Sequence, residues 1–262
     1  MKKLEMKTIT LFVDCDGVWL GRTRERNDYN NRHDYANLLM TLENISRKRN
    51  YRLITLTDRG GAQLPTLAYI FQGDRFQGGE SGAVAYDNHA HSIISNPRFE
   101  KAIKKIEVIR RDFLNKFGEY FPLEPGVYSS IRVERVDNAD LTEPEIFLSE
   151  VARKSEGLFT FADHGDCLCL KPSIINKRLG IEWICNLYEQ TNAPIDLFNS
   201  IWIGDGNSDI PAADFVRRNG GKIGGVSNSQ ENYKNFILEK GGYLAKESHT
   251  AGMVEIIKHF CD

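Results

Sequence analysis

Three short apolar runs, each ending abruptly in polar or glycine residues, constrain the fold of this chain more than any other feature of its sequence. The runs span residues 9–13, 53–56 and 201–203, and they are followed by Asp14, by Thr57 and by Gly204 with Asp205. Largely apolar runs of this length are typical of buried parallel strands. In open α/β sheets, ligands bind beyond the carboxyl ends of the strands, so these strand ends predict one shared site.

Helical patterns separate the apolar runs. Residues 34–49 and 177–190 are predicted to be helical, and in the second segment Ile181, Ile184 and Tyr188 recur at helical spacing. Strands that alternate with helices indicate an α/β fold with a Rossmann-like, doubly wound parallel sheet.

The middle of the chain has a different pattern. Its segments are, in order, a long amphipathic helix with Phe99, Ile103, Ile106, Phe113 and Phe117 on one stripe, an alternating strand over 127–136, a helix over 142–155 and a strand over 158–161. This succession is an α+β pattern, unlike the flanking segments. We interpret residues 89–168 as an α+β cap domain inserted into a catalytic core made of residues 1–88 and 169–262.

Charge and cysteine usage limit the classes of partner and the location. The formal net charge of −2 gives no electrostatic reason to expect nucleic acid or an anionic membrane as partner. Five cysteines without a C-x-x-C pair argue against a disulfide framework and for a reducing compartment. The first apolar run is short and ends in two aspartates, so we expect no signal peptide or membrane helix and a cytoplasmic location. A homo-oligomer is compatible with the sequence.

The sequence Asp14-Cys15-Asp16-Gly17 directly follows the first strand. Two carboxylates at i and i+2 can divide the chemistry, one attacking an electrophile and the other handling a proton. Gly17 lets the backbone turn sharply and lie close to a ligand. Taken alone, the pattern also fits a calcium loop or an ordinary turn.

A second acidic pair, Asp205 and Asp209, follows the third apolar run across a turn rich in Gly and Asn. Both carboxylates can approach one hard cation, and Mg²⁺ prefers such oxygen ligands. The alternative is a helix N-cap with an acidic neighbour. Thr57 ends the second strand and can hold phosphate oxygens, whereas Lys177 begins a helix, where its charge opposes the helix dipole unless an anion is near.

Together these residues resemble the four motifs of the haloacid-dehalogenase (HAD) superfamily. The motifs are, in order, TLFVDCDGVWL, LITLTDR, IINKRLGIEWI and IWIGDGNSDIPAAD, and the resemblance covers roughly residues 7–88 and 170–260. The run GESGAV at 79–84 is similar to the E-N-G-A segment of the subgroup whose cap lies between the second and third motifs. That subgroup includes Cof-type, sucrose-phosphate, trehalose-phosphate and mannosylphosphoglycerate phosphatases.

The resemblance implies a role for each matched residue. Asp14 would be the nucleophile and a Mg²⁺ ligand, and Asp16 the general acid and base, with its backbone carbonyl on the metal. Thr57, Lys177 and the backbone at Gly17 would hold the substrate phosphate. The remaining metal ligands would be Asp205 and Asp209, the latter directly or through water. We also expect neighbouring carboxylates to favour the protonated form of Asp16.

Several positions depart from the family pattern. Asp58 stands where the family has Gly in T-G-R, which places an extra carboxylate near the substrate phosphate. Residues 20–35 make a longer segment after the first motif than we expect. Lys171 competes with Lys177 for the role of the phosphate-binding lysine. Candidate cap contacts to the substrate are Arg132, Arg135 and His164.

The predicted function is a Mg²⁺-dependent phosphomonoester hydrolase that works through an aspartyl-phosphate on a small phosphorylated sugar or related metabolite. The alternative is a phosphosugar mutase of the phosphomannomutase type, which would carry a further G-D-K-T-like segment that we do not find. A phosphorelay receiver is typically about half this length and has no inserted cap. A non-catalytic phosphate-binding protein on the same fold is the remaining alternative.

Overall fold

A five-stranded parallel sheet forms the centre of the larger part of the molecule. The computed structural model describes residues 8–19, 31–48, 50–135, 139–163 and 167–261. The central sheet has the order β11-β10-β9-β1-β2, with every pair parallel. Its strands are β1 (Ile9–Val13), β2 (Tyr51–Thr55), β9 (Ser200–Gly204), β10 (Lys222–Gly225) and β11 (Tyr243–Leu244).

Helices cover both faces of this sheet, because successive strand residues point to opposite sides. Leu11 and Val13 of β1 pack with α1 and α8 in one apolar cluster, and Phe12 between them packs with α5, α6 and α7 in another. These helices are α1 (Asn31–Lys48), α5 (Lys177–Gln190), α6 (Ile210–Arg218), α7 (Glu231–Glu239) and α8 (His249–Cys261). The predicted α/β fold with a doubly wound parallel sheet is therefore confirmed.

A small antiparallel sheet lies beside the central one, in the order β3-β4-β5. An isolated parallel bridge between Leu56 and Gly78 links it to the chain just beyond β2. The elements of this region are α2 (Leu64–Ile70), β3 (Phe76–Gly79), β4 (Val84–Asp87) and β5 (Ser92–Ser95).

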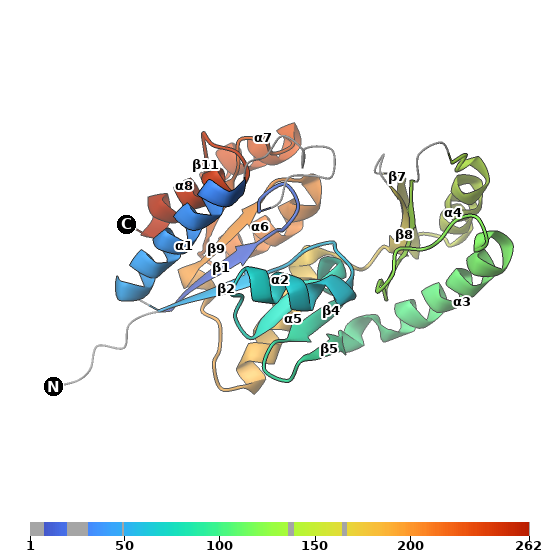
Figure 1. Cartoon of the computed structure of the whole chain (residues 1–262), viewed down its shortest axis with the longest axis horizontal. Coiled ribbons are helices and arrows are strands. Elements are labelled where there is room, and N and C mark those ends of the chain that lie inside the picture. The colour runs from blue at the N-terminus through green and yellow to red at the C-terminus, as the bar shows by residue number, and fades with distance from the viewer. Residues whose placement is uncertain (1–7, 20–30, 49, 136–138, 164–166, 262) are drawn as a thin grey trace.

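A third sheet, also antiparallel, stands apart from the larger body together with two helices (Figure 1). Its order is β6-β8-β7, and α3 and α4 supply its apolar core through residues such as Phe113 and Leu148. The elements are α3 (Glu100–Phe117), β6 (Ile131–Glu134), α4 (Thr142–Lys154), β7 (Phe159–Asp163) and β8 (Cys167–Pro172). We call this unit the cap.

The domain limits proposed from the sequence stay a prediction. The sheets add two facts about the chain near these limits: residues 92–95 form β5 and pair with β4, whereas β8 continues in the cap sheet to Pro172.

Two of the predicted elements, β1 and α5, have the predicted bounds. The alternating segment at 127–136 is strand only from Ile131 to Glu134. The backbone amides of Tyr128 and Ser129 donate instead to the Glu80 carboxylate, so they are not available to a strand partner. In the described parts of the chain no helix is both long and apolar enough to cross a membrane.

Candidate active site

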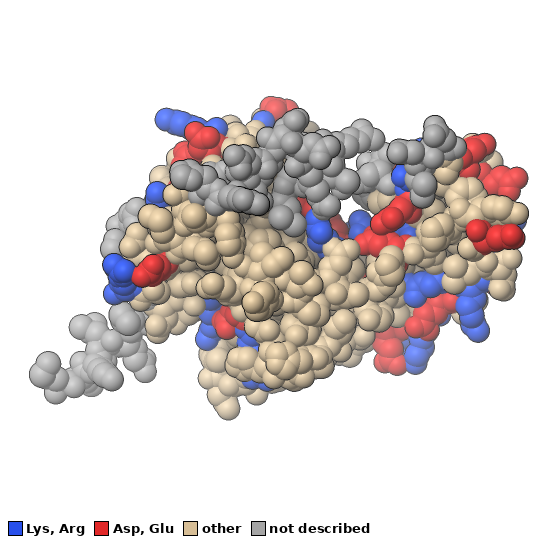
Figure 2. Space-filling model, viewed as in Figure 1, with Lys and Arg blue, Asp and Glu red and all other residues tan. Residues whose placement is uncertain are grey.

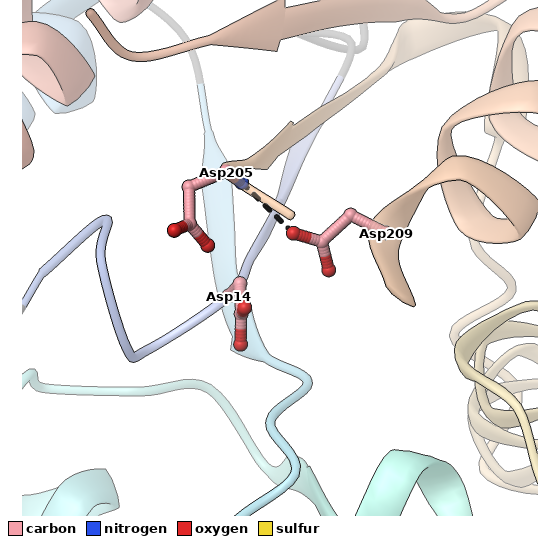
Figure 3. Close-up of side chains that lie close together, drawn as sticks. All are labelled: Asp14, Asp205 and Asp209. Carbon is pink, nitrogen blue, oxygen red and sulfur yellow. Dashed lines mark hydrogen bonds between the residues drawn. The ribbon is translucent and has the colours of Figure 1, made fainter. Parts of the chain in front are cut away.

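Three buried carboxylates meet at the carboxyl edge of the central sheet (Figure 3). Asp14 follows β1, Asp205 follows β9, and Asp209 ends the short turn of helix that precedes α6. Strands β1 and β9 are parallel neighbours, with Val13 opposite Ile203, so their ends lie side by side. One oxygen from each carboxylate lies within 4.8 Å of the others.

Lys177, the first residue of α5, lies against this cluster. Its side chain is 1% exposed, and its Nζ lies 2.7 Å from Asp14 Oδ2 and 2.6 Å from Asp209 Oδ1. Burial disfavours the charged form of Lys177, but the two aspartates outweigh it and hold the lysine pKa well above its usual value. Burial raises the pKa of Asp14, Lys177 opposes this, and the neighbouring carboxylates add to it.

Backbone amides fix the orientation of two of the carboxylates. Asp209 Oδ2 accepts hydrogen bonds from the amides of Asp205, at 2.8 Å, and Gly206, at 3.0 Å. Asp14 Oδ1 accepts from the amide of Cys15 at 2.7 Å. Together with Lys177, these contacts engage both oxygens of Asp14 and both oxygens of Asp209.

Gly17 provides the space for Asp205. Its φ of +82° lies in the left-handed region, and a Cβ at this position would stand 2.1 Å from Asp205 Oδ2. The Gly17 carbonyl accepts a hydrogen bond from Asn228 Nδ2 at 2.8 Å. The structure therefore places Gly17 against a predicted metal ligand; its predicted contact with substrate stays a prediction.

Asp16 is paired with Arg59, where we expected other carboxylates. Arg59 Nε donates to Asp16 Oδ2 at 2.9 Å, and Arg59 Nη2 donates to Asp16 Oδ1 at 2.6 Å. This two-point contact fixes the position of the carboxylate. Arg59 is not among the site residues predicted from the sequence, although it ends the LITLTDR run. Its position directly after Thr57 and Asp58 was the signal that could have identified it.

Thr57 and Asp58 lie between the carboxylate cluster and the cap. Thr57 is fully buried, and its hydroxyl accepts a hydrogen bond from the amide of Arg59 at 3.2 Å. The Ser81 hydroxyl donates to the Asp58 carboxylate. Burial alone would raise the pKa of Asp58, but Lys177 and Lys171 outweigh it and hold that pKa well below its usual range.

Solved structures with this architecture decide the fold. A haloacid dehalogenase-like hydrolase from Bacteroides thetaiotaomicron aligns with a TM-score of 0.62 and 17% sequence identity, over 97% of this chain and 99% of its own. The sucrose-phosphatase from Synechocystis, solved with sucrose and phosphate, aligns with a TM-score of 0.60 and 17% identity, over 97% and 98%. The fold is that of the HAD-like hydrolases.

A third solved structure similar to this chain is the C-terminal domain of the trehalose-6-phosphate phosphatase from C. albicans. It aligns with a TM-score of 0.56 and 12% identity, over 91% of this chain and 93% of its own. By sequence alone, neither a protein-family model nor a curated protein matches.

The cap reaches the HAD-like core through some of the candidate contacts and not through others. Arg132 Nη1 donates to the Asp58 carbonyl at 3.3 Å, and Lys171 Nζ lies 3.4 Å from Ser81 Oγ, so Lys171 is outside the carboxylate cluster. Arg135 instead pairs with Asp163 at 3.0 Å on the cap. His164 and residues 20–30 of the segment 20–35 lie outside the described residues.

The residues present fit a divalent cation. Three buried carboxylates share one place in which Lys177 pairs with Asp14 and Asp209, and a divalent cation would lower the energetic cost of gathering these charges. Carboxylate oxygens are the ligands that Mg²⁺ prefers. Asp14 and Asp205 would hold it, Asp209 would act directly or through water, and the metal role of the Asp16 carbonyl stays a prediction.

Proposed function

We propose that this chain is a Mg²⁺-dependent phosphomonoester hydrolase in which Asp14 accepts the phosphoryl group. The pairing of a buried Asp14 with Lys177, beside Asp205 and Asp209, carries this proposal. An anionic carboxylate can attack an anionic phosphate only where positive charge is held ready for the phosphoryl oxygens. Lys177 provides one such charge, and a bound Mg²⁺ would supply further charge neutralisation as a Lewis acid.

The chain's own residues account for the two halves of the reaction. An Asp14 oxygen forms a bond to phosphorus while the bond from phosphorus to the leaving oxygen breaks, and Asp16 gives that oxygen its proton. In the second half Asp16 takes a proton from water, whose oxygen attacks the phosphorus. Inorganic phosphate leaves and the Asp14 carboxylate is regenerated. In the structure both Asp16 oxygens accept hydrogen bonds from Arg59, which favours the ionised carboxylate, so Asp16 must leave this contact and take up a proton from water before it acts as the acid.

The likeness to phosphatases of sugar phosphates supports the choice of substrate class. The sucrose-phosphatase and the trehalose-6-phosphate phosphatase domain align with more than nine tenths of this chain. We therefore propose a small phosphorylated sugar or related metabolite as the substrate of this chain.

The test is phosphate release from a panel of phosphorylated sugars and polyols, with Mg²⁺ and with EDTA. We expect release that depends on Mg²⁺ and falls by about a thousandfold or more in Asp14→Asn and Lys177→Met. Asp16→Asn should bind metal normally and still lose turnover. Lys104→Ala, an exposed lysine of α3, serves as the control and should be normal. Release that is equal with EDTA, or undiminished in Asp14→Asn, would contradict the proposal.

A further inference from the structure

The open face of the cap sheet carries polar groups toward the core. Leu168 and Leu170 of β8 belong to the apolar core of the cap, so the alternate residues Cys169 and Lys171 point to the other face. Arg132 of β6 stands opposite Cys169 in the register and shares that face. Two cations, Arg132 and Lys171, therefore come from one face of the cap.

This face meets the core at Asp58. Arg132 donates to the Asp58 carbonyl, and Lys171 lies within 3.4 Å of the Ser81 hydroxyl that donates to the Asp58 carboxylate. In the space-filling view, basic and acidic side chains lie together in a recess between the larger body and the cap (Figure 2). Asp58 is thus the acidic group of the core that faces the two cap cations.

Reaction geometry directs the leaving group past Asp58. Phosphoryl transfer places the attacking and leaving oxygens roughly in line, so the leaving group extends from the phosphorus away from Asp14. The cap lies over this edge of the core, at Asp58 and Ser81. Asp58 follows the end of β2, whose Thr55 pairs with Val13 of β1, so Asp58 and Asp14 leave the sheet at the same edge.

Among the described residues, each of the two cap cations has an acidic neighbour. Arg132 pairs with Glu124 at 3.2 Å, and Lys171 faces Asp58 through Ser81. Glu124 and Asp58 thus reduce the attraction of Arg132 and Lys171 for a second anionic group on the substrate, and the Asp58 carboxylate would itself repel such a group. Hydroxyl groups both donate and accept hydrogen bonds. A hydroxylated leaving group therefore suits a path lined by the Asp58 carboxylate, the Ser81 hydroxyl and the cations Arg132 and Lys171.

We propose that Asp58 is a specificity-determining residue that excludes substrates with a second anionic group, so that the leaving group is uncharged and hydroxylated. This inference rests on the proposed function and narrows its substrate class. It also opposes a phosphosugar mutase, because such an enzyme must hold a sugar bisphosphate.

The test compares glucose 6-phosphate with glucose 1,6-bisphosphate, which differ by one phosphate. Binding of each is measured by calorimetry in an Asp14→Asn background, where neither ligand is turned over, with Mg²⁺ present. We expect the bisphosphate to bind more weakly than the monophosphate. The quantity compared is the ratio of the bisphosphate Kd to the monophosphate Kd. Adding Asp58→Asn should lower this ratio by about tenfold or more, because the substitution removes one repelling charge and frees Lys171.

A second variant gives the opposite sign and guards against a folding defect in the first. Lys171→Gln removes the cap cation that faces the Asp58 carboxylate through Ser81, so the ratio should widen. Glu150→Gln on α4 removes one exposed cap carboxylate and controls for net charge; its ratio should stay within twofold of the parent. Equal weakening of both ligands in Asp58→Asn, or a ratio that moves the same way in both test variants, would overturn the inference.

The outcome is separable from that of the proposed function. If the unmodified chain releases no phosphate from any monophosphate, the proposed function fails, while the binding ratios still test Asp58. If it releases phosphate and the ratios do not respond to Asp58→Asn, only the role of Asp58 fails.

Discussion

Some residues of this site matter because they leave space for a neighbouring carboxylate, and others because of the charged group that they carry. Gly17 and Gly204 both make room for carboxylates: a Cβ at Gly204 would lie 2.5 Å from Asp209 Oδ2, just as one at Gly17 would meet Asp205. Lys177 shows the opposite requirement, a long side chain that is fully buried because two aspartates surround its ammonium group. The two glycines thus lie so close to carboxylates that an added methyl group would clash with them.

Gly17→Ala should therefore lower the free energy of unfolding by more than the positive φ of this residue alone explains. Gly157 has a φ of +87° and nothing within 4 Å of its notional Cβ, which makes Gly157→Ala a matched control. We expect Gly157→Ala to lower the free energy of unfolding by about 1 kcal/mol. Gly17→Ala should lose about 1–3 kcal/mol more from overpacking, and should weaken Mg²⁺ binding by displacing Asp205. Urea unfolding and metal titration measure the two effects; equal losses in both variants would refute the steric account.

At the scale of elements, one buried carboxylate ties the chain that enters the cap sheet to the core. Glu80, 5% exposed, accepts hydrogen bonds from the amide of Gly61 in the core and from the amides of Tyr128 and Ser129 just before β6. It also accepts from the Ser129 hydroxyl. Sequence reasoning used the GESGAV run only for its resemblance and assigned Glu80 no role. The geometry makes Glu80 one of the residues that link the two parts.

Glu80→Ala should weaken this link between the core and the segment that precedes β6. Three backbone amides lose their acceptor, and each buried unsatisfied donor costs about 1 kcal/mol or more, so we expect a loss of about 3 kcal/mol in the free energy of unfolding. Hydrogen exchange at the Tyr128 and Ser129 amides should accelerate in the folded protein. Glu100→Gln, an exposed residue of α3, is the control. Unchanged exchange at those two amides would count against the assignment.

A second carboxylate, that of Asp87, stabilises the turn between β4 and β5. Asp87 Oδ1 accepts from the amides of His89 and Ala90, and its Oδ2 lies 3.0 Å from Arg75 Nη2. Burial alone would raise the pKa of Asp87, but Arg75 and the two amides outweigh it and lower that pKa. A lowered pKa in the folded state means that the contribution to stability is present above the unfolded pKa, near 3.9, and is lost as the pH falls through the folded pKa.

Asp87→Asn should consequently destabilise the protein in a pH-dependent way. At pH 7 we expect a loss of about 1 kcal/mol relative to the unmodified chain. Below pH 4 the difference should shrink, because the unfolded unmodified chain takes up a proton at Asp87 first and the folded chain follows only at lower pH. Urea unfolding of both proteins across this range checks the sign. A difference that is constant with pH would show that the charge of Asp87 is not involved.

The whole molecule places its chemistry where two independently packed units face one another. The central sheet contributes the carboxylates and Lys177, and the cap contributes Arg132 and Lys171 across the recess. The carboxylate cluster belongs to the core alone, so a cation bound there should stabilise the core whatever the position of the cap.

Mg²⁺ should thus raise the thermal midpoint of the intact chain. A ligand that binds only the folded state at about 100 times its Kd adds about 2.7 kcal/mol. For a chain of this size that corresponds to a rise of about 5 °C or more. Asp205→Asn should abolish most of the rise, and calorimetry with and without Mg²⁺ measures it. An equal rise in Asp205→Asn would place the cation elsewhere.

The sequence by itself determined several of the elements and the edge of the sheet at which the candidate site lies. The bounds of β1 and α5 follow from local periodicity, and Asp14 and Asp205 meet because parallel neighbours end at one edge. These features depend on residues close together in the chain, or on a rule common to all parallel sheets.

Only the tertiary structure decided which side chains pair across that edge. Arg59 on Asp16, Glu80 on the amides at 128 and 129, and Arg132 at Asp58 join segments that are 43 to 74 residues apart. Such pairs depend on side-chain rotamers and on where the cap rests against the core. No local pattern encodes either of them, because the partners meet only when the whole chain has packed.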